Sequence, residues 1–240
     1  MAEFGNPDVI EEEVDILLIG GGMACCGTAF EIPRWIEASG KDISVKLVDK
    51  AAMDRSGAVA QGLSAINTYI GPEQDPADYA RMVSNDLMGI TRDDLAYDLG
   101  RHVDESVHLF EEWGLPIWKT DENGERFDGS KGMTSLKDGG KPVRSGKWQI
   151  MINGESYKWI VAEAAKKALG VDRIDERIFI VKLINDKNDP SKIAGAVGFS
   201  TRDDKIVIYK AKAILLAAGG CVNIFRPRSV GEGTGRAWYP

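Results

Sequence analysis

Short apolar runs and an amphipathic segment alternate over the first fifty residues. Val14 to Ile19 is a run of β-forming residues that ends in three glycines, typical of a buried parallel strand entering a tight turn. Residues 23 to about 38 are small at first and then amphipathic, so we expect a helix, kinked by Pro33 and ended by Gly40. Ile43 to Asp49 predicts a second strand, which completes a βαβ unit.

The rest of the chain repeats both kinds of pattern. Pro76 to Trp113 has apolar residues at spacings of three and four, which predicts helix, and a further helix is expected over Glu155 to Leu169. Strands are expected at 178–184, 194–200, 206–209 and 213–218, with a turn at Asp189-Pro190. No internal repeat or linker marks a boundary. The expected fold is α/β, a Rossmann-like domain with additional β-strands.

Composition narrows the functional classes. The 240 residues are 43% hydrophobic, enough for a sizeable core, and the net charge of −7 with scattered basic residues argues against a nucleic-acid partner. The longest apolar runs are too short for a membrane span. Cys25, Cys26 and Cys221 form no CxxC, so the spacing predicts neither a disulfide framework nor a metal site, and a reducing, cytoplasmic location is expected.

The candidate chemistry begins at the three glycines Gly20, Gly21 and Gly22. A glycine turn between a strand and a helix lets the backbone approach a pyrophosphate, and the helix N-terminus at Met23 then faces the phosphate charge. The position of the third glycine of a GxGxxG motif is taken by Cys25, which is still small enough for close helix packing. The turn predicts a dinucleotide site, although an ordinary α/β turn has the same appearance.

Asp49 strengthens the prediction of a dinucleotide site. It ends the second predicted strand, where a carboxylate can accept hydrogen bonds from the ribose hydroxyls of an adenosine. A carboxylate there disfavours the 2′-phosphate of NADP. FAD and NAD both remain compatible, as does a surface Asp in an unrelated α/β domain.

The next segment separates these alternatives. KAAMDRSGAVAQGLSAINTY, residues 50–69, resembles the flavin-contacting stretch of the fumarate reductase and succinate dehydrogenase flavoprotein superfamily. Residues 217–220 (AAGG) and 231–233 (GEG) are similar to its later signatures. The resemblance implies cofactor contacts from Gly20, Gly21, Gly22, Met23, Asp49, Lys50, Ser56, Gly57, Ala60, Gln61, Gly62, Ser64, Ala65, Asn67, Ala217, Ala218, Gly219 and Gly220. Because Gly57 stands where the succinate dehydrogenase branch has its flavin-linked histidine, noncovalent FAD is implied.

Within that superfamily the chain most resembles the adenylylsulfate reductase alpha subunits. The resemblance is carried by RSGAVAQGLSAINTY, GRHVDESVHLFEEWGLPIW, WQIMINGESYK and FRPRSVGEGTGRAWYP, and it covers nearly the whole chain. Members of that family are considerably longer. The resemblance therefore implies that residues 1–240 are the N-terminal part of an FAD-binding domain, incomplete at its C-terminus, without the capping domain and later segments.

That resemblance implies an oxidoreductase of sulfur metabolism, which reduces adenylylsulfate reversibly by two electrons to sulfite and AMP. It places Asn67 beside the reacting flavin edge and Trp238 in the substrate channel, and we predict these two as catalytic residues. The chain has no cysteine set for an iron–sulfur cluster, so the resemblance implies electron transfer through the clusters of a beta subunit in a heterodimer. No metal ligand is predicted in this chain.

Two other functions stay open. A fumarate reductase or aspartate oxidase would use the same FAD domain on a dicarboxylate, and a non-catalytic flavin-binding module would fit the short length. His102 and His108 fall six residues apart on one predicted helix, and therefore on different faces, so we interpret both as structural.

Overall fold

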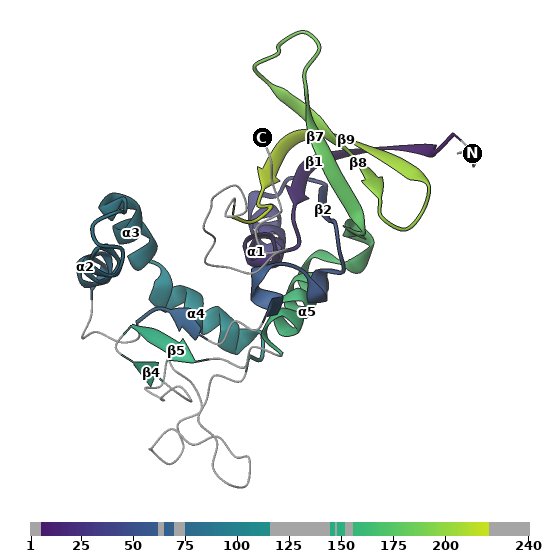
Figure 1. Ribbon diagram of the computed structural model, residues 1–240. Helices are drawn as coiled ribbons and strands as arrows, with labels where there is room; N and C mark the ends of the chain where they lie inside the picture. The colour runs from purple at the N-terminus through teal and green to yellow at the C-terminus, as the bar shows by residue number, and fades with distance from the viewer. Residues whose placement is uncertain are drawn as a thin grey trace, which may run out of the picture. The chain divides into compact units, whose positions relative to one another are not determined.

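The computed structural model describes residues 6–61, 65–69, 75–115, 145–146, 148–151 and 156–220 (Figure 1). The chain folds into two compact units. Unit 1 comprises residues 1–61 and 158–240, and unit 2 comprises residues 62–157. Each unit is described by itself below.

Unit 1 is built on a six-stranded sheet in the order β6-β2-β1-β9-β8-β7. The strands are β1 (Asp8–Ile19), β2 (Val45–Asp49), β6 (Ile174–Glu176), β7 (Ile178–Asn185), β8 (Ile193–Ser200) and β9 (Lys205–Leu216). The pairs β1–β2, β1–β9 and β2–β6 are parallel, whereas β7–β8 and β8–β9 are antiparallel. Figure 1 shows β7 and β8 as a long hairpin. The predicted α/β, Rossmann-like fold is confirmed.

Two strands are longer than the sequence pattern predicted. β1 begins at Asp8, not Val14, and β9 is one strand where the pattern predicted two, at 206–209 and 213–218. The two strands pair in parallel from Asp8↔Lys205 to Ile19↔Leu216. The polar residues that obscured the pattern face one another across this pair, because Lys210 lies 2.6 Å from Glu11 and Lys212 lies 2.5 Å from Asp15. Tertiary pairing therefore overrides the low β-propensity of these charged segments.

Two helices of unit 1 adjoin the sheet. α1 (Met23–Ser39) follows β1, continues through Pro33 and ends at Gly40, whose φ of +64° suits a left-handed C-cap. α5 (Tyr157–Leu169) leads through the short helix η4 (Val171–Arg173) into β6. The core of the sheet comprises Val14, Leu17, Ile19, Val48, Ala196, Val207, Tyr209 and Ala211. The predicted start of the second helix at Glu155 lies outside the described residues.

Unit 2 contains three helices where the pattern predicted continuous helix over 76–113. They are α2 (Pro76–Asp86), α3 (Asp93–Gly100) and α4 (Val103–Glu112). Asp75 caps α2 by accepting a hydrogen bond from the Asp78 N–H, and the positive φ of Met88 and Gly89 ends the helical path after it. A small sheet of β3 (Ala65–Asn67), β5 (Gln149–Met151) and β4 (Ser145–Gly146) accompanies them. Among the described residues of this unit, Tyr69, Tyr79 and Val103 form a buried cluster.

Contrary to the prediction, the two histidines do not both lie inside one helix. His102 is the N-cap residue of α4 and is not inside the helix, whereas His108 lies in α4 with its Nε2 3.8 Å from Asp104. Their structural role stays a prediction. Across the described ranges, no helix is long and apolar enough to cross a membrane. In the same residues, no group of three or more His, Cys, Asp and Glu is placed to hold a metal ion.

Candidate functional site

The carboxyl ends of three parallel strands meet at the glycine turn. Ile19 of β1 pairs with Val48 of β2 on one side and with Leu216 of β9 on the other. The Gly20 N–H donates to the Val48 carbonyl at 2.8 Å, and the Ala217 N–H donates to the Ile19 carbonyl at 2.9 Å. Ligands of open α/β sheets bind at this edge, beyond the carboxyl ends of the strands.

Gly20 has to be glycine for two independent reasons. Its φ is +110°, a region that L side chains rarely adopt. A Cβ placed there would also lie 2.4 Å from the Ala217 carbonyl oxygen. The turn therefore depends on close backbone approach between the ends of β1 and β9.

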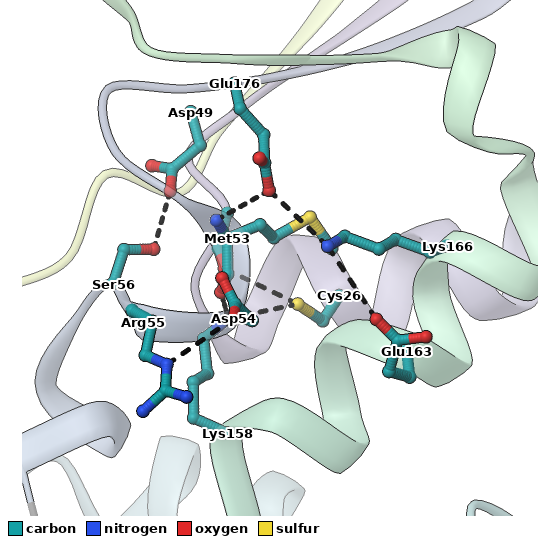
Figure 2. Close-up of polar contacts among 11 residues, drawn as sticks. Cys26, Asp49, Met53, Asp54, Arg55, Ser56, Lys158, Glu163, Lys166 and Glu176 are labelled. Atoms are coloured by element: carbon teal, nitrogen blue, oxygen red, sulfur yellow. Dashed lines mark hydrogen bonds and ion pairs between the residues drawn. The ribbon is translucent and has the colours of Figure 1, made fainter.

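Gly21 and Asp49 pack directly against each other. A Cβ at Gly21 would lie 2.8 Å from the Asp49 carboxyl carbon, so only glycine leaves room for this side chain. Asp49 is 6% exposed, and its Oδ2 accepts a 2.5 Å hydrogen bond from the Ser56 hydroxyl (Figure 2). Its Oδ1 accepts no hydrogen bond from the residues that the structure describes. The carboxylate is thus oriented by one internal donor and has capacity for another.

The N-terminus of α1 is suited to an anion. Its N-cap is Gly22, no side chain caps the helix, and no acidic residue stands in the first turn. The N–H groups of a first helical turn have no intrahelical acceptor and carry the positive end of the helix dipole. A Cβ at Gly22 would meet no atom of the described residues within 4 Å, so these residues leave the space next to Gly22 open.

Cys25 and Cys26 attach the start of α1 to the glycine turn. Both are buried, and each thiol donates to a main-chain oxygen, Cys25 to Ile19 at 3.7 Å and Cys26 to Gly21 at 3.5 Å. Burial raises the pKa of Cys25 to about 12 and also raises the pKa of Cys26. Burial and these raised pKa values favour the neutral thiols and suit both side chains to a packing role.

The segment after β2 folds back along the glycine turn. It forms two short helices, η1 (Met53–Arg55) and η2 (Ala58–Gln61), and Lys50 lies with its ammonium 5.9 Å from the Phe179 ring. Between the helices, Gly57 has φ +84°, and a Cβ there would lie 3.9 Å from the Gly22 Cα. The structure thus brings Ser56 and Gly57 to the same site as Gly21, Gly22 and Asp49.

Other predicted cofactor residues are distributed as follows. Met23 begins α1, and Ala60 and Gln61 belong to η2. Ala217, Ala218, Gly219 and Gly220 follow the end of β9, with Gly219 at φ +93°. Gly62 and Ser64 lie outside the described residues.

The described structure includes only one of the two predicted catalytic residues, Asn67. Asn67 is the last residue of β3 in unit 2, where it is exposed and pairs with Gln149 of β5. Ala65, also predicted at the cofactor, begins the same strand. Trp238 lies outside the described residues. The roles of Asn67 and Trp238 stay predictions.

Lys158 and Glu176 contribute to the site but were not predicted from the sequence. Lys158, at the start of α5, is 2% exposed and donates to the Met53 carbonyl oxygen (Figure 2). Glu176 Oε1 accepts from the Met53 N–H at 2.8 Å. The only sequence signal for Lys158 is a charged residue among the otherwise apolar positions of residues 157–162, where an exposed lysine is the usual outcome.

The comparisons with known proteins agree with this geometry. Residues 15–235 match the model of the FAD binding domain family, so the chain belongs to that family. The chain is 63% identical over 238 residues to the adenylylsulfate reductase subunit alpha of Megalodesulfovibrio gigas. That alignment covers 98% of this chain and 36% of the relative.

Solved structures give the same result. The adenylylsulfate reductase of the hyperthermophilic Archaeoglobus fulgidus matches with a TM-score of 0.76 and 52% identity, over 98% of this chain and 34% of that chain. A structure of adenosine-5-phosphosulfate reductase in complex with sulfite, as a covalent adduct, matches equally well. The E. coli quinol fumarate reductase FrdA matches at a TM-score of 0.61 and 16% identity, over 90% of this chain and 34% of that chain, and shares the fold. The chain spans about a third of the length of these relatives.

Proposed function

We propose that the chain is the N-terminal flavin-binding part of an adenylylsulfate reductase alpha subunit. The proposed reaction is the reversible two-electron reduction of adenylylsulfate to sulfite and AMP, and the proposed cofactor is noncovalent FAD. The observation that carries the proposal lies at the carboxyl ends of β1 and β2, where Gly21 packs against Asp49 and Ser56 donates a hydrogen bond to the same carboxylate. The chain that holds this arrangement is 63% identical to a reductase of this kind.

The residues present fit the adenosine and pyrophosphate portions of FAD. The uncapped N-terminus of α1 and the open space at Gly22 suit a pyrophosphate. The Oδ1 of Asp49 suits a ribose hydroxyl, because a buried carboxylate gains most from a donor that it does not otherwise have. When bound, FAD would supply the two-electron chemistry, and the protein would supply position and charge.

Noncovalent binding is supported by Gly57. This residue has φ +84°, so the backbone of a histidine in its place would be strained. A glycine here allows the segment to pass next to the turn but offers no side chain for a covalent link to a flavin.

The rest of the proposed enzyme follows from the resemblance to the reductases. Asn67 and Trp238 would contact the substrate, and a beta subunit with iron–sulfur clusters would deliver electrons in a heterodimer. Asn67 supports such a role because it is exposed at the end of β3 and its amide offers both a donor and an acceptor. A cytoplasmic location is proposed from the cysteine content.

The first test is the visible spectrum of the purified protein and identification of the cofactor that acid releases. Flavin bands with free FAD in the supernatant are expected. Flavin that stays with the precipitate would contradict noncovalent binding. The full-length subunit, assembled with its iron–sulfur partner, should reduce adenylylsulfate and not fumarate, whereas the opposite preference would identify a dicarboxylate enzyme. A full-length assembly that binds FAD but turns over neither substrate would indicate a non-catalytic flavin module.

Asn67 provides the test of the substrate end. Asn67→Ala should lower the turnover of adenylylsulfate per bound FAD by about a hundredfold, the usual cost of losing a donor that stabilises developing charge. Steady-state kinetics and the flavin-to-protein ratio check this. Asn85→Ala, in α2, is the matched control. Unchanged turnover in Asn67→Ala would remove Asn67 from the mechanism.

A further inference from the structure

Lys158 is a buried cation of unusual placement. The residue is 2% exposed, and among the residues that the structure describes its ammonium has two acceptors, the Met53 carbonyl oxygen and the Cys26 sulfur at 3.8 Å. Among the described residues, no carboxylate lies within ion-pair distance of it, whereas Lys46 pairs with Glu12 and Asp175. Burial of an ammonium group without a counter-ion is costly, so a second contribution has to offset it.

The two acceptors belong to the two halves of the candidate dinucleotide site. Cys26 is in the first turns of α1, and its thiol donates to the Gly21 carbonyl in the glycine turn. Met53 begins the turn of η1 that leads to Ser56, whose hydroxyl donates to Asp49. Lys158 lies outside the βαβ unit and contacts both halves of the site (Figure 2). Through Cys26 it is linked to the turn that would face the pyrophosphate, and through Met53 to the segment that orients the Asp49 carboxylate.

Glu176 binds the other polar group of the Met53 backbone. Glu176 accepts the Met53 N–H, and Lys166 lies 3.6 Å from Glu176 and 3.8 Å from Glu163. Both polar groups of the Met53 peptide backbone are thus bound by side chains of α5 and β6. Because the Met53 side chain is also completely buried, the start of η1 has little freedom to move.

We propose that Lys158 is a positioning residue for the adenosine and pyrophosphate half of the cofactor. Its ammonium sets the spacing between the glycine turn and the Ser56–Asp49 pair, and its buried positive charge favours an anionic ligand in the site. The proposal rests on the FAD binding proposed above. Part of the affinity for the cofactor would then come from α5, which lies outside the glycine motif.

The test uses the full-length flavoprotein stripped of its cofactor. Lys158→Met should raise the dissociation constants of FAD and of ADP by the same factor, about tenfold, as expected for loss of a charged hydrogen-bonding group. ADP carries the adenosine and pyrophosphate without the flavin ring. Lys167→Met, an exposed lysine of the same helix, is the control and should leave both constants unchanged. Flavin fluorescence and competition by ADP give the constants, and thermal unfolding of the stripped protein reports stability.

Each result decides between the alternatives. Equal loss of FAD and ADP affinity in folded Lys158→Met supports positioning. Unchanged affinities with a lower melting temperature would show a purely structural lysine, and loss for FAD alone would place its effect at the ring; both overturn the proposal. If Lys158→Met does not fold, Cys26→Ala decides, with about a threefold loss expected for both ligands and no loss overturning it. A wild-type protein that binds no FAD would contradict the proposed function itself.

Discussion

The two ends of the β1–β9 pair are paired in one continuous register but are held together differently. At the carboxyl end, the backbones approach so closely that Gly20 leaves no space for a Cβ, and Gly21 leaves none because the Asp49 side chain, which Ser56 orients, packs against it. Between the amino end and the middle of the pair, exposed or half-buried side chains of opposite charge pair across the strands, Glu11 with Lys210 and Asp15 with Lys212. The first arrangement tolerates almost no change, and the second tolerates many, because exposed ion pairs contribute little to stability.

The largest expected effect is at the carboxyl end. Gly21→Ala places a methyl group 2.8 Å from the Asp49 carboxyl carbon, which displaces a side chain held by Ser56. The FAD dissociation constant should rise by at least about a hundredfold, the cost of roughly 3 kcal/mol. Flavin titration measures it.

Gly27→Ala is the matched control in α1, since a Cβ there meets nothing within 4 Å. It should leave FAD binding intact and stabilise the protein by about 0.5–1 kcal/mol, because alanine is the better helix former. Equal effects of the two substitutions on FAD binding would contradict the claim that the close contact between Gly21 and Asp49 matters for binding.

The next effect is the loss of a charged acceptor. Asp49→Asn keeps the shape of the side chain but removes the charge that a ribose hydroxyl would meet, so the FAD dissociation constant should rise about tenfold or more. The exposed Asp203→Asn is the control. An unchanged constant in the Asp49 variant would contradict its assignment as the ribose acceptor.

A smaller effect, on stability alone, is expected at Tyr209, in the first half of β9. The hydroxyl of the completely buried Tyr209 donates to Asp175 at 2.7 Å. Tyr209→Phe should lower the free energy of unfolding by about 1.5 kcal/mol, as for a hydrogen bond to a charged group. Denaturant unfolding checks this. A change in FAD affinity with it would show that the two ends of the sheet are coupled.

The smallest effect concerns acid stability at Asp15. Hydrogen bonds from the Lys212 ammonium, and then from Ser44, lower the pKa of Asp15 to about 2. Because the folded pKa lies below the unfolded value of about 3.9, the carboxylate stabilises the protein fully above about pH 4 and loses this contribution as the pH falls through about 2. Melting temperatures measured from about pH 5 to about pH 2 should fall less steeply for Asp15→Asn than for the wild type. Parallel curves would show that Asp15 contributes nothing.

Local patterns predicted the parts of the site that lie close in sequence. The run Val14 to Ile19, the glycines and the acid at the end of the next strand are each governed by short-range rules for strands, turns and ribose contacts, and the structure places them together. The break between α2 and α3 was missed because a left-handed residue such as Met88 leaves no periodic signal. The extent of β9 was missed because charged residues interrupt its apolar pattern.

The sequence by itself determined the α/β class, the βαβ unit and the glycine turn, because strand and helix periods and the steric demands of glycine act over a few residues. Only the tertiary structure decided that Lys158 and Glu176, more than a hundred residues from Met53, hold its backbone. It also decided that Gly21 must leave room for Asp49. Burial, and which groups meet across a sheet, depend on the packing of distant segments, and no local pattern encodes them.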